Sequence, residues 1–390
     1  MMTKEEFKDI APIDDADFDA KMQSLVKEPG FEHAVRYMMP TTDYDKLKAD
    51  MLSVHNKEEF QLKIMYPFLE MLASRFTDGV TSNGISNIKG VGTFITNHRD
   101  IVLDASFLNL CLIRAKIPTS EIAIGNNLLI YEWIEDLVKL NKSFIVKRNL
   151  EMRQALEAAK QLSAYIHYCI TEKNQSVWIA QREGRSKDSS DHTQESLIKM
   201  MALAGEGDML QNVMEVKLMP TAISYEYDPN DYLKAREFLL RSKDPDFKKS
   251  QRDDLFSMET GLVGNKGRVH FSIGECINPQ LERLSDITDK NELVRAICAV
   301  IDNTIHAGFH IYPINYIAYD RLNGTEEFSQ FYTDDDVKKV DEYVESQLAK
   351  VAKELPDPVS DEDYKFMIEK MWTMYANPLK NKLTVEAVHA

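Results

Sequence analysis

The sequence predicts an α/β protein with a central mixed sheet flanked by helices, an N-terminal helical cap and a helical C-terminal extension. Two observations predict this class. Short runs of β-branched and aromatic residues alternate with helical segments between about residues 85 and 285. On both sides of that region, apolar residues recur at helical spacing between charged ones. We therefore expect a cap at 1–84, an α/β domain at 85–285 and a helical extension packed on it at 286–390.

The N-terminal cap is predicted from three helical segments, at residues 18–26, 46–54 and 57–76. A stretch rich in Gly, Ser and Asn follows at 77–92 and separates the cap from the first predicted strand.

The central region is predicted to contain strands at 91–96, 143–146, 176–180, 213–222 and 269–273, with helices between several of them. Strands that alternate with helices favour crossover connections within one sheet.

The C-terminal extension begins with a predicted helix at 288–308, where Asp289 and Glu292 have the spacing of a capping box. Two further helices are expected, at 334–354 and 361–375, on either side of the helix-breaking sequence ELPDPVS.

Composition excludes several functional classes. The 390 residues include 47 Lys and Arg against 63 Asp and Glu, a formal charge of -16, so we expect no nucleic-acid partner. An anionic ligand must therefore find a local basic pocket. The 4 cysteines have no paired spacing, which argues against a zinc site or disulfide framework and favours a reducing cytoplasm. No spanning helix or targeting segment is predicted.

Two histidines, His306 and His310, have the i, i+4 spacing that could place metal ligands on one helix face. Gly308 lies between them and no third ligand is near in the sequence, so we interpret both as structural and expect no metal.

Chemistry is predicted at residues 96–104, between a predicted strand and an apolar helical run. His98 lies there with carboxylates at Asp100 and Asp104. A histidine at the end of a strand suits a general base, and a nearby carboxylate orients its ring and stabilises the imidazolium. We expect Asp104 to be this partner, with Asp100 as the alternative.

Four segments, at 97–104, 125–149, 177–191 and 213–229, occur in an order that resembles the glycerophospholipid acyltransferase superfamily, and 264–277 is similar to the strand that closes the family's domain. The resemblance covers about residues 85–280. It implies that His98 is the base and Asp104 its partner, although five residues separate them here and four in the family's pattern. It places Arg148 and the Glu183 to Lys187 segment in the acceptor site, where Arg185 or Lys187 takes the family's Arg position. The full set of substrate-binding candidates is Asn97, Arg99, Gly125, Lys147, Arg148, Glu183, Gly184, Arg185, Ser186, Lys187 and Pro220.

The resemblance implies transfer of a fatty acyl group from an acyl-carrier protein or coenzyme A (acyl-CoA) thioester to a hydroxyl of a phosphate-bearing acceptor. Glycerol-3-phosphate is the simplest acceptor, in phospholipid biosynthesis, and no bound cofactor is implied. We expect a cytoplasmic protein, peripheral on the inner face of the cell membrane, to which its product would pass. Two alternatives stay open: a lysophospholipid or amino-acid lipid as acceptor, and a lipid-binding relative without catalysis.

Overall fold

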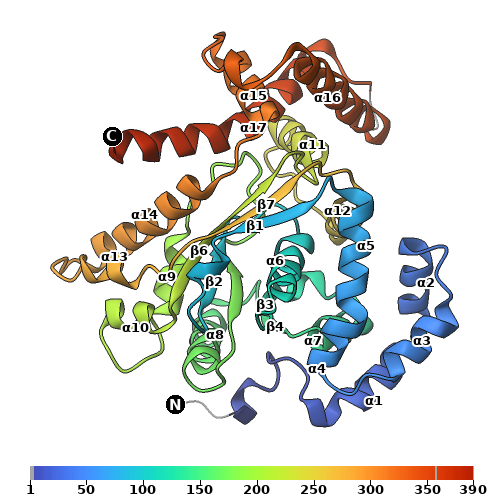
Figure 1. Cartoon of the computed structure of the whole chain (residues 1–390), viewed down its shortest axis with the longest axis vertical. Helices are drawn as coiled ribbons and strands as arrows, with labels where there is room; N and C mark the ends of the chain where they lie inside the picture. The colour runs from blue at the N-terminus through green and yellow to red at the C-terminus, as the bar shows by residue number, and fades with distance from the viewer. Residues whose placement is uncertain (1–3, 356–357, 390) are drawn as a thin grey trace.

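The computed structural model describes residues 4–355 and 358–389. Its centre is a seven-stranded sheet in the order β1-β7-β6-β2-β5-β3-β4, covered by helices (Figure 1). The predicted fold class is confirmed. The strands are β1 (Val80–Asn83), β2 (Thr93–Thr96), β3 (Glu121–Gly125), β4 (Ser143–Val146), β5 (Val177–Ala180), β6 (Leu218–Tyr225) and β7 (Val269–Ile273).

Five neighbouring strands of this sheet, β6, β2, β5, β3 and β4, run parallel to one another. Strand β7 is antiparallel to β6, with Thr221 opposite Ile273, and β1 joins β7 in parallel at the edge. The carboxyl ends of the five parallel strands therefore meet at one edge of the sheet, where α/β proteins commonly bind ligands.

The strand predictions were correct in four places and wrong in three. Strands β2, β4, β5 and β7 lie within the predicted ranges, whereas β1 and β3 were not predicted. The predicted strand at 213–222 begins only at Leu218, because helix α10 (Met209–Glu215) occupies the preceding residues. A capping box between Asp208 and Gln211 starts that helix.

The N-terminal cap is helical, as predicted. It consists of α1 (Asp15–Leu25), α2 (Pro29–Met38), α3 (Tyr44–Leu52), α4 (Lys57–Phe60) and α5 (Tyr66–Phe76), and a π-helical turn, η2 (Gln61–Met65), joins α4 to α5. Figure 1 shows these helices along one side of the molecule, away from the C-terminus. Their shared core includes Phe18, Phe31 and Phe60, and it is closed by Leu140 of α7 (Glu132–Leu140).

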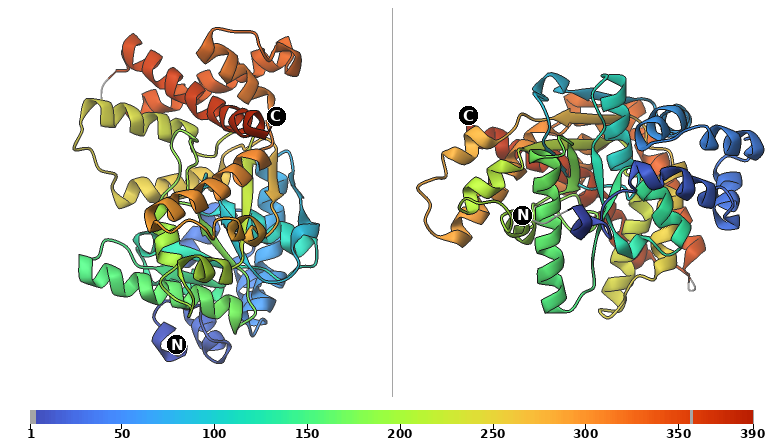
Figure 2. Two further views of the ribbon diagram at one scale, coloured as in Figure 1. Left: turned by 90° about the vertical axis from the view of Figure 1, so that its left-hand side faces the viewer. Right: turned by 90° about the horizontal axis from the view of Figure 1, so that it is seen from below.

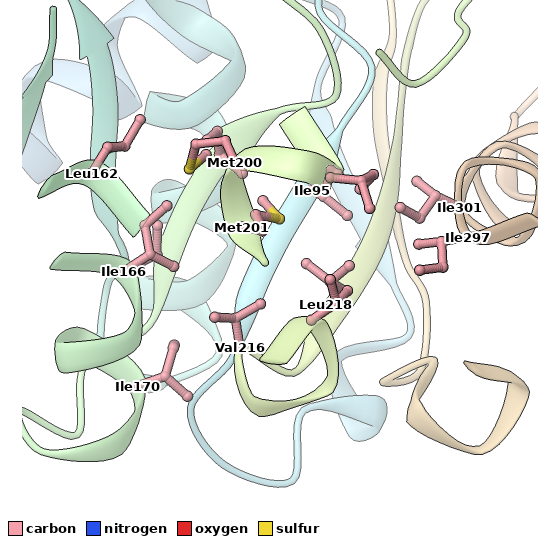
Figure 3. Close-up of a cluster of buried hydrophobic side chains, with 14 of the residues drawn as sticks. Ile95, Leu162, Ile166, Ile170, Met200, Met201, Val216, Leu218, Ile297 and Ile301 are labelled. Carbon is pink, nitrogen blue, oxygen red and sulfur yellow. The ribbon is translucent and has the colours of Figure 1, made fainter. Parts of the chain in front are cut away.

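Two apolar layers bury the two faces of the sheet. On one face, Phe94, Trp178 and Met219 pack under α5 and α6 (Leu103–Arg114). On the other face, the neighbouring residues Ile95 and Leu218 pack under α8 (Met152–Thr171), α9 (Glu195–Met201), α10 and α14 (Lys290–Gly308), as Figure 3 shows. The remaining central elements are α11 (Asp231–Lys243), α12 (Gln251–Val263), α13 (Asn278–Glu282) and the short turns η1 (Lys4–Phe7), η3 (Ile85–Asn87) and η4 (Asn126–Leu128).

The helices after α14 form a layer beyond the sheet, seen at the top of the left-hand view of Figure 2. After α14 come α15 (Pro313–Asn323), η5 (Ser329–Phe331), α16 (Asp334–Glu354) and α17 (Asp361–His389). Helices α14 and α16 match the predictions, α15 was not predicted, and α17 continues through Pro378 past the predicted end at 375. In the described part of the chain, no helix is long and apolar enough to cross a membrane.

Candidate functional site

A cavity of about 2000 Å³ lies at the carboxyl edge of the five parallel strands. Its walls differ in chemistry. Apolar side chains from the cap, α7 and α12 form one part: Phe31, Val35, Leu47, Met51, Phe68, Met71, Ile134, Leu137, Leu255 and Met258. Basic side chains from the strand ends, α11 and the loop after it form the other: Arg148, Arg182, Arg185, Lys187, Arg241 and Lys249. The cavity therefore suits a ligand with a long apolar part and an anionic part.

His98 lies two residues beyond the end of β2 and lines this cavity. Its Nδ1 is 2.8 Å from Oδ2 of Asp104, in the first turn of α6. A carboxylate only accepts hydrogen bonds, so the Nδ1–H tautomer is favoured and the lone pair lies on Nε2. No residue in the described ranges is hydrogen-bonded to Nε2, and the His98 side chain is 15% exposed. The geometry is that of an oriented general base.

Asp104 is fixed from several directions. Its Oδ2 also accepts hydrogen bonds from the backbone N–H groups of Arg99 at 2.7 Å and Asp100 at 3.1 Å. Its Oδ1 accepts a hydrogen bond from the Tyr225 hydroxyl at 3.0 Å, which reaches across from the end of β6. The carboxylate is 1% exposed, so these donors replace the water that it has lost.

Asp100, the alternative partner of His98, has a different place. Its Oδ1 accepts hydrogen bonds from the backbone N–H groups of Val102 and Leu103 at 2.8 and 2.7 Å, and so satisfies donors at the start of α6. Burial, together with the charge of Asp104, raises the pKa of Asp100. The structure thus places Asp104 against His98 and uses Asp100 to begin the helix.

Arginines at the ends of β4 and β5 bring positive charge to the same cavity. Arg148 follows β4 and lies with its Nη1 3.6 Å from Glu183 Oε1. Gly125 at the end of β3 makes room for it, because a Cβ there would lie 2.9 Å from the Arg148 Cζ. Arg185 is only 7% exposed, and its Nη1 is buried without a hydrogen-bond partner in the described structure. A buried guanidinium in this state calls for an anion.

A second group of cations surrounds Glu237 of α11. Its carboxylate lies 2.6 Å from Lys187, 3.0 Å from Lys249 and 3.2 Å from Arg241. Burial and the charges of Arg185 and Lys249 lower the pKa of Lys187 to about 7, although Glu237 opposes the shift. Burial alone would raise the pKa of Glu237, but Lys187 and Lys249 outweigh it and hold that pKa at about 2.

Several candidates from the sequence join His98 at the cavity. Gly125, Lys147, Arg148, Glu183, Gly184, Arg185 and Lys187 all line it. Lys147 is also paired with Asp9 and donates a hydrogen bond to Gln161 at 3.1 Å, so its charge is already used.

Four other candidates do not line the cavity. Asn97 is bonded through its side chain to the backbone of Ile223, which ties β2 to β6. Arg99 is buried in a two-pronged ion pair with Asp191, at 2.7 and 2.5 Å.

The two remaining candidates are structural in their contacts. Ser186 is buried, and its backbone N–H donates to the carbonyl of His98 at 3.0 Å, which fixes the loop after β5 beside His98. Pro220 lies within β6, and its carbonyl accepts from the Gly274 N–H at 3.0 Å.

The sequence did not point to five residues of this site: Trp178, Tyr225, Glu237, Arg241 and Lys249. Trp178 lies edge-on to His98, with ring centroids 5.8 Å apart, and its buried Nε1 has no hydrogen-bond partner in the part of the chain described. Trp178 lies within the third segment of the resemblance and Tyr225 within the fourth, and this is the only local signal for either. Nothing in the pattern around Glu237, Arg241 or Lys249 marks them.

The histidine pair outside the cavity has protein partners. His306 Nε2 lies 2.9 Å from the Asp191 carbonyl oxygen, and the His310 ring packs 5.1 Å from that of His270. Among the residues described, no group of three or more His, Cys, Asp or Glu side chains is placed to hold a metal ion.

No family model matches the chain, and no curated protein matches it at a significant level.

Proposed function

We propose that this protein is an acyltransferase that moves a fatty acyl group from a thioester to a hydroxyl of a phosphate-bearing acceptor, with glycerol-3-phosphate as the simplest case. One observation carries the proposal: the oriented His98–Asp104 pair opens into a cavity that is apolar on one part and basic on another. The order of segments that resembles glycerophospholipid acyltransferases supports it independently.

His98 serves as the base in this reaction. Its Nε2 takes the proton from the acceptor hydroxyl as the oxygen attacks the thioester carbonyl. The new C–O bond forms and the C–S bond breaks, and the proton passes from His98 to the departing thiolate. Asp104, held by Tyr225 and two backbone N–H groups, stabilises the imidazolium in between.

The basic and apolar parts of the cavity wall bind different parts of the two substrates. Arg148 and Arg185 hold the phosphate of the acceptor, because guanidinium groups bind phosphate through paired hydrogen bonds. The acyl chain lies along the apolar wall formed by the cap and α12. Delivery of the product to a membrane surface would place the protein at that surface as a peripheral protein.

The test is thiol release from a long-chain acyl-CoA by the purified protein, with and without glycerol-3-phosphate. We expect acceptor-dependent release, reduced by about 10²–10⁴-fold in His98→Ala because the general base is lost. His55→Ala is the matched control, since His55 also contacts an aspartate, Asp19 at 3.0 Å, but does not line the cavity.

Each other outcome has a definite meaning. Full turnover in His98→Ala would contradict general-base catalysis by His98. Release without acceptor dependence would indicate hydrolysis. No release with glycerol-3-phosphate, lysophospholipids or amino-acid lipids, combined with binding of the thioester, would favour a lipid-binding protein without catalysis.

A further inference from the structure

The cation group around Glu237 is larger than its single carboxylate can neutralise. Lys187, Arg241 and Lys249 all contact Glu237, so three basic side chains share this one carboxylate. Each ammonium group has three N–H donors, and Glu237 occupies one of them in Lys187 and in Lys249. Donors therefore remain free for another anion.

All three cations line the cavity, but they differ in exposure, since the Arg241 side chain is 53% exposed to solvent. The side chains of Lys249 and Lys187 are 20% and 28% exposed, and Glu237 is 6% exposed. Arg185, buried and without a partner at Nη1, lies near enough for its charge to act on Lys187. The cost of burying several like charges together is recovered when an anion binds among them.

The group draws in part on different elements from the acceptor arginine Arg148. Arg148 follows β4, at the outer edge of the parallel strands, with β3 and β5 between it and β2. Glu237 and Arg241 belong to α11, which follows β6 on the opposite side of β2. His98 follows β2, and Lys187 joins the group from the loop after β5, the strand next to β2.

We propose that Lys187, Arg241 and Lys249 form a second phosphate-binding subsite, which holds the phosphate groups of coenzyme A when the acyl thioester is bound. This inference rests on the proposed transferase function and names its donor.

Coenzyme A fits these cations better than a carrier protein does. A carrier protein presents its acidic residues on a folded surface, whereas Lys187 and Lys249 lie within a cavity that a slender phosphate ester can enter. The formal charge of -16 on this chain also repels an acidic protein as a whole.

The experiment compares three donors: acyl-CoA, acyl-3′-dephospho-CoA and acyl-pantetheine, which lacks all the phosphates. In Arg241→Ala/Lys249→Ala, we expect the KM for acyl-CoA to rise by at least about tenfold. The KM for acyl-pantetheine and the KM for glycerol-3-phosphate should stay within about twofold. Lys187 remains in this variant and keeps Glu237 paired.

Lys243→Ala is the matched control. Lys243 is also on α11, but it pairs with Asp363 at 2.7 Å and does not line the cavity, so its removal should change no KM.

A binding measurement separates this inference from the proposed function. Titration calorimetry with 3′-phosphoadenosine 5′-phosphate should show binding that weakens at least about tenfold in the double variant, with or without turnover. If transfer occurs but acyl-CoA and the nucleotide bind equally to both proteins, the subsite is wrong and the function stands. A rise in the acceptor KM alone would assign these cations to the acceptor and overturn the proposal.

Discussion

At the scale of single residues, Asp104 accepts more hydrogen bonds than the one that it forms with His98. Four hydrogen bonds reach its carboxylate: from His98, from two backbone N–H groups of the β2–α6 loop, and from Tyr225. The first three donors come from the same loop as the base, whereas Tyr225 belongs to β6. Tyr225 is therefore a positioning residue that fixes the pair to the neighbouring strand.

Tyr225→Phe removes this one hydrogen bond and keeps the buried ring. A hydrogen bond to a charged group contributes about 1.5–3 kcal/mol, so we expect kcat to fall by about tenfold or more. The KM for the acceptor should not change, because Tyr225 does not line the cavity. Steady-state kinetics measures this split between kcat and KM.

Tyr375→Phe is the matched control, since it removes a buried tyrosine hydroxyl that donates to another aspartate, Asp231, at 2.7 Å. A purely structural role for Tyr225 would lower the unfolding midpoint in both variants and leave kcat unchanged in both.

At the scale of elements, α11 links the cavity to the C-terminal helices. Its Leu233 and Leu239 pack in one apolar core with residues of α15, α16 and α17. At its first residue, Asp231 accepts hydrogen bonds from Tyr343 of α16 at 2.6 Å and Tyr375 of α17 at 2.7 Å. The C-terminal helices thus determine where α11 presents Glu237 and its cations.

Asp231→Asn tests this anchor through the pH dependence of stability. Burial raises the pKa of Asp231 to about 6 from 3.8, so the folded state holds a proton that the unfolded chain releases. The free energy of unfolding therefore falls as pH rises between these two pKa values. Above about pH 6 the protein bears the full cost of an ionised, buried Asp231. Asn carries no such charge. We therefore expect the free energy of unfolding of the variant, relative to that of the wild type, to rise by about 1 kcal/mol from pH 5 to pH 8. Urea denaturation at the two pH values measures the difference.

A difference between the two proteins that is the same at both pH values would contradict the ionisation argument. It would mean that Asp231 contributes only through its hydrogen bonds, which the amide oxygen of Asn can partly accept.

The two strands that the sequence did not predict, β1 and β3, were missed for the same physical reason. Strand β3 begins with Glu121, which looks exposed in sequence but is 1% exposed and bonded to Tyr165 and Lys173. Strand β1 has the polar sequence VTSN and pairs only at the edge of the sheet. Tertiary partners decide both strands, and no local pattern contains them.

Local pattern and tertiary contacts also account for different parts of the site: the His98–Asp104 pair and the cations around Glu237. His98 and Asp104 are six residues apart and meet across one loop, so a local pattern could predict them. Arg241 and Lys249 reach the cavity only because distant helices hold α11 in place. Arg99, a candidate next to His98 in the sequence, instead forms a buried ion pair with Asp191, 92 residues away.

At the scale of the whole molecule, charge is divided between surface and cavity. The chain has a formal charge of -16, yet one part of the cavity wall is basic. A large acidic partner meets the repulsion of the whole surface, whereas a small anion that enters the cavity meets the cations directly.

This division predicts opposite salt effects for two donors. Between about 10 and 150 mM salt the screening length falls from roughly 30 to 8 Å. We expect kcat/KM for an acyl carrier protein to rise over this range as repulsion is screened. For acyl-CoA we expect KM to rise, because the contacts with Lys187 and its neighbours weaken. Acyl-pantetheine, without phosphates, is the control, and a carrier-protein donor that works best at low salt would contradict the argument.

The pairing of β1 with β7 also determines how long β1 lacks its partner strand during synthesis of the chain. Thr81 is bonded to His270, 189 residues further along the chain. At about 5–20 residues per second, a ribosome needs on the order of 10–40 s to cover that distance. Throughout this interval β1 waits without its partner strand, while the apolar residues of α5 lack part of the layer that covers them. The seven-stranded sheet can therefore be completed only after β7, its last strand in the sequence, has been synthesised.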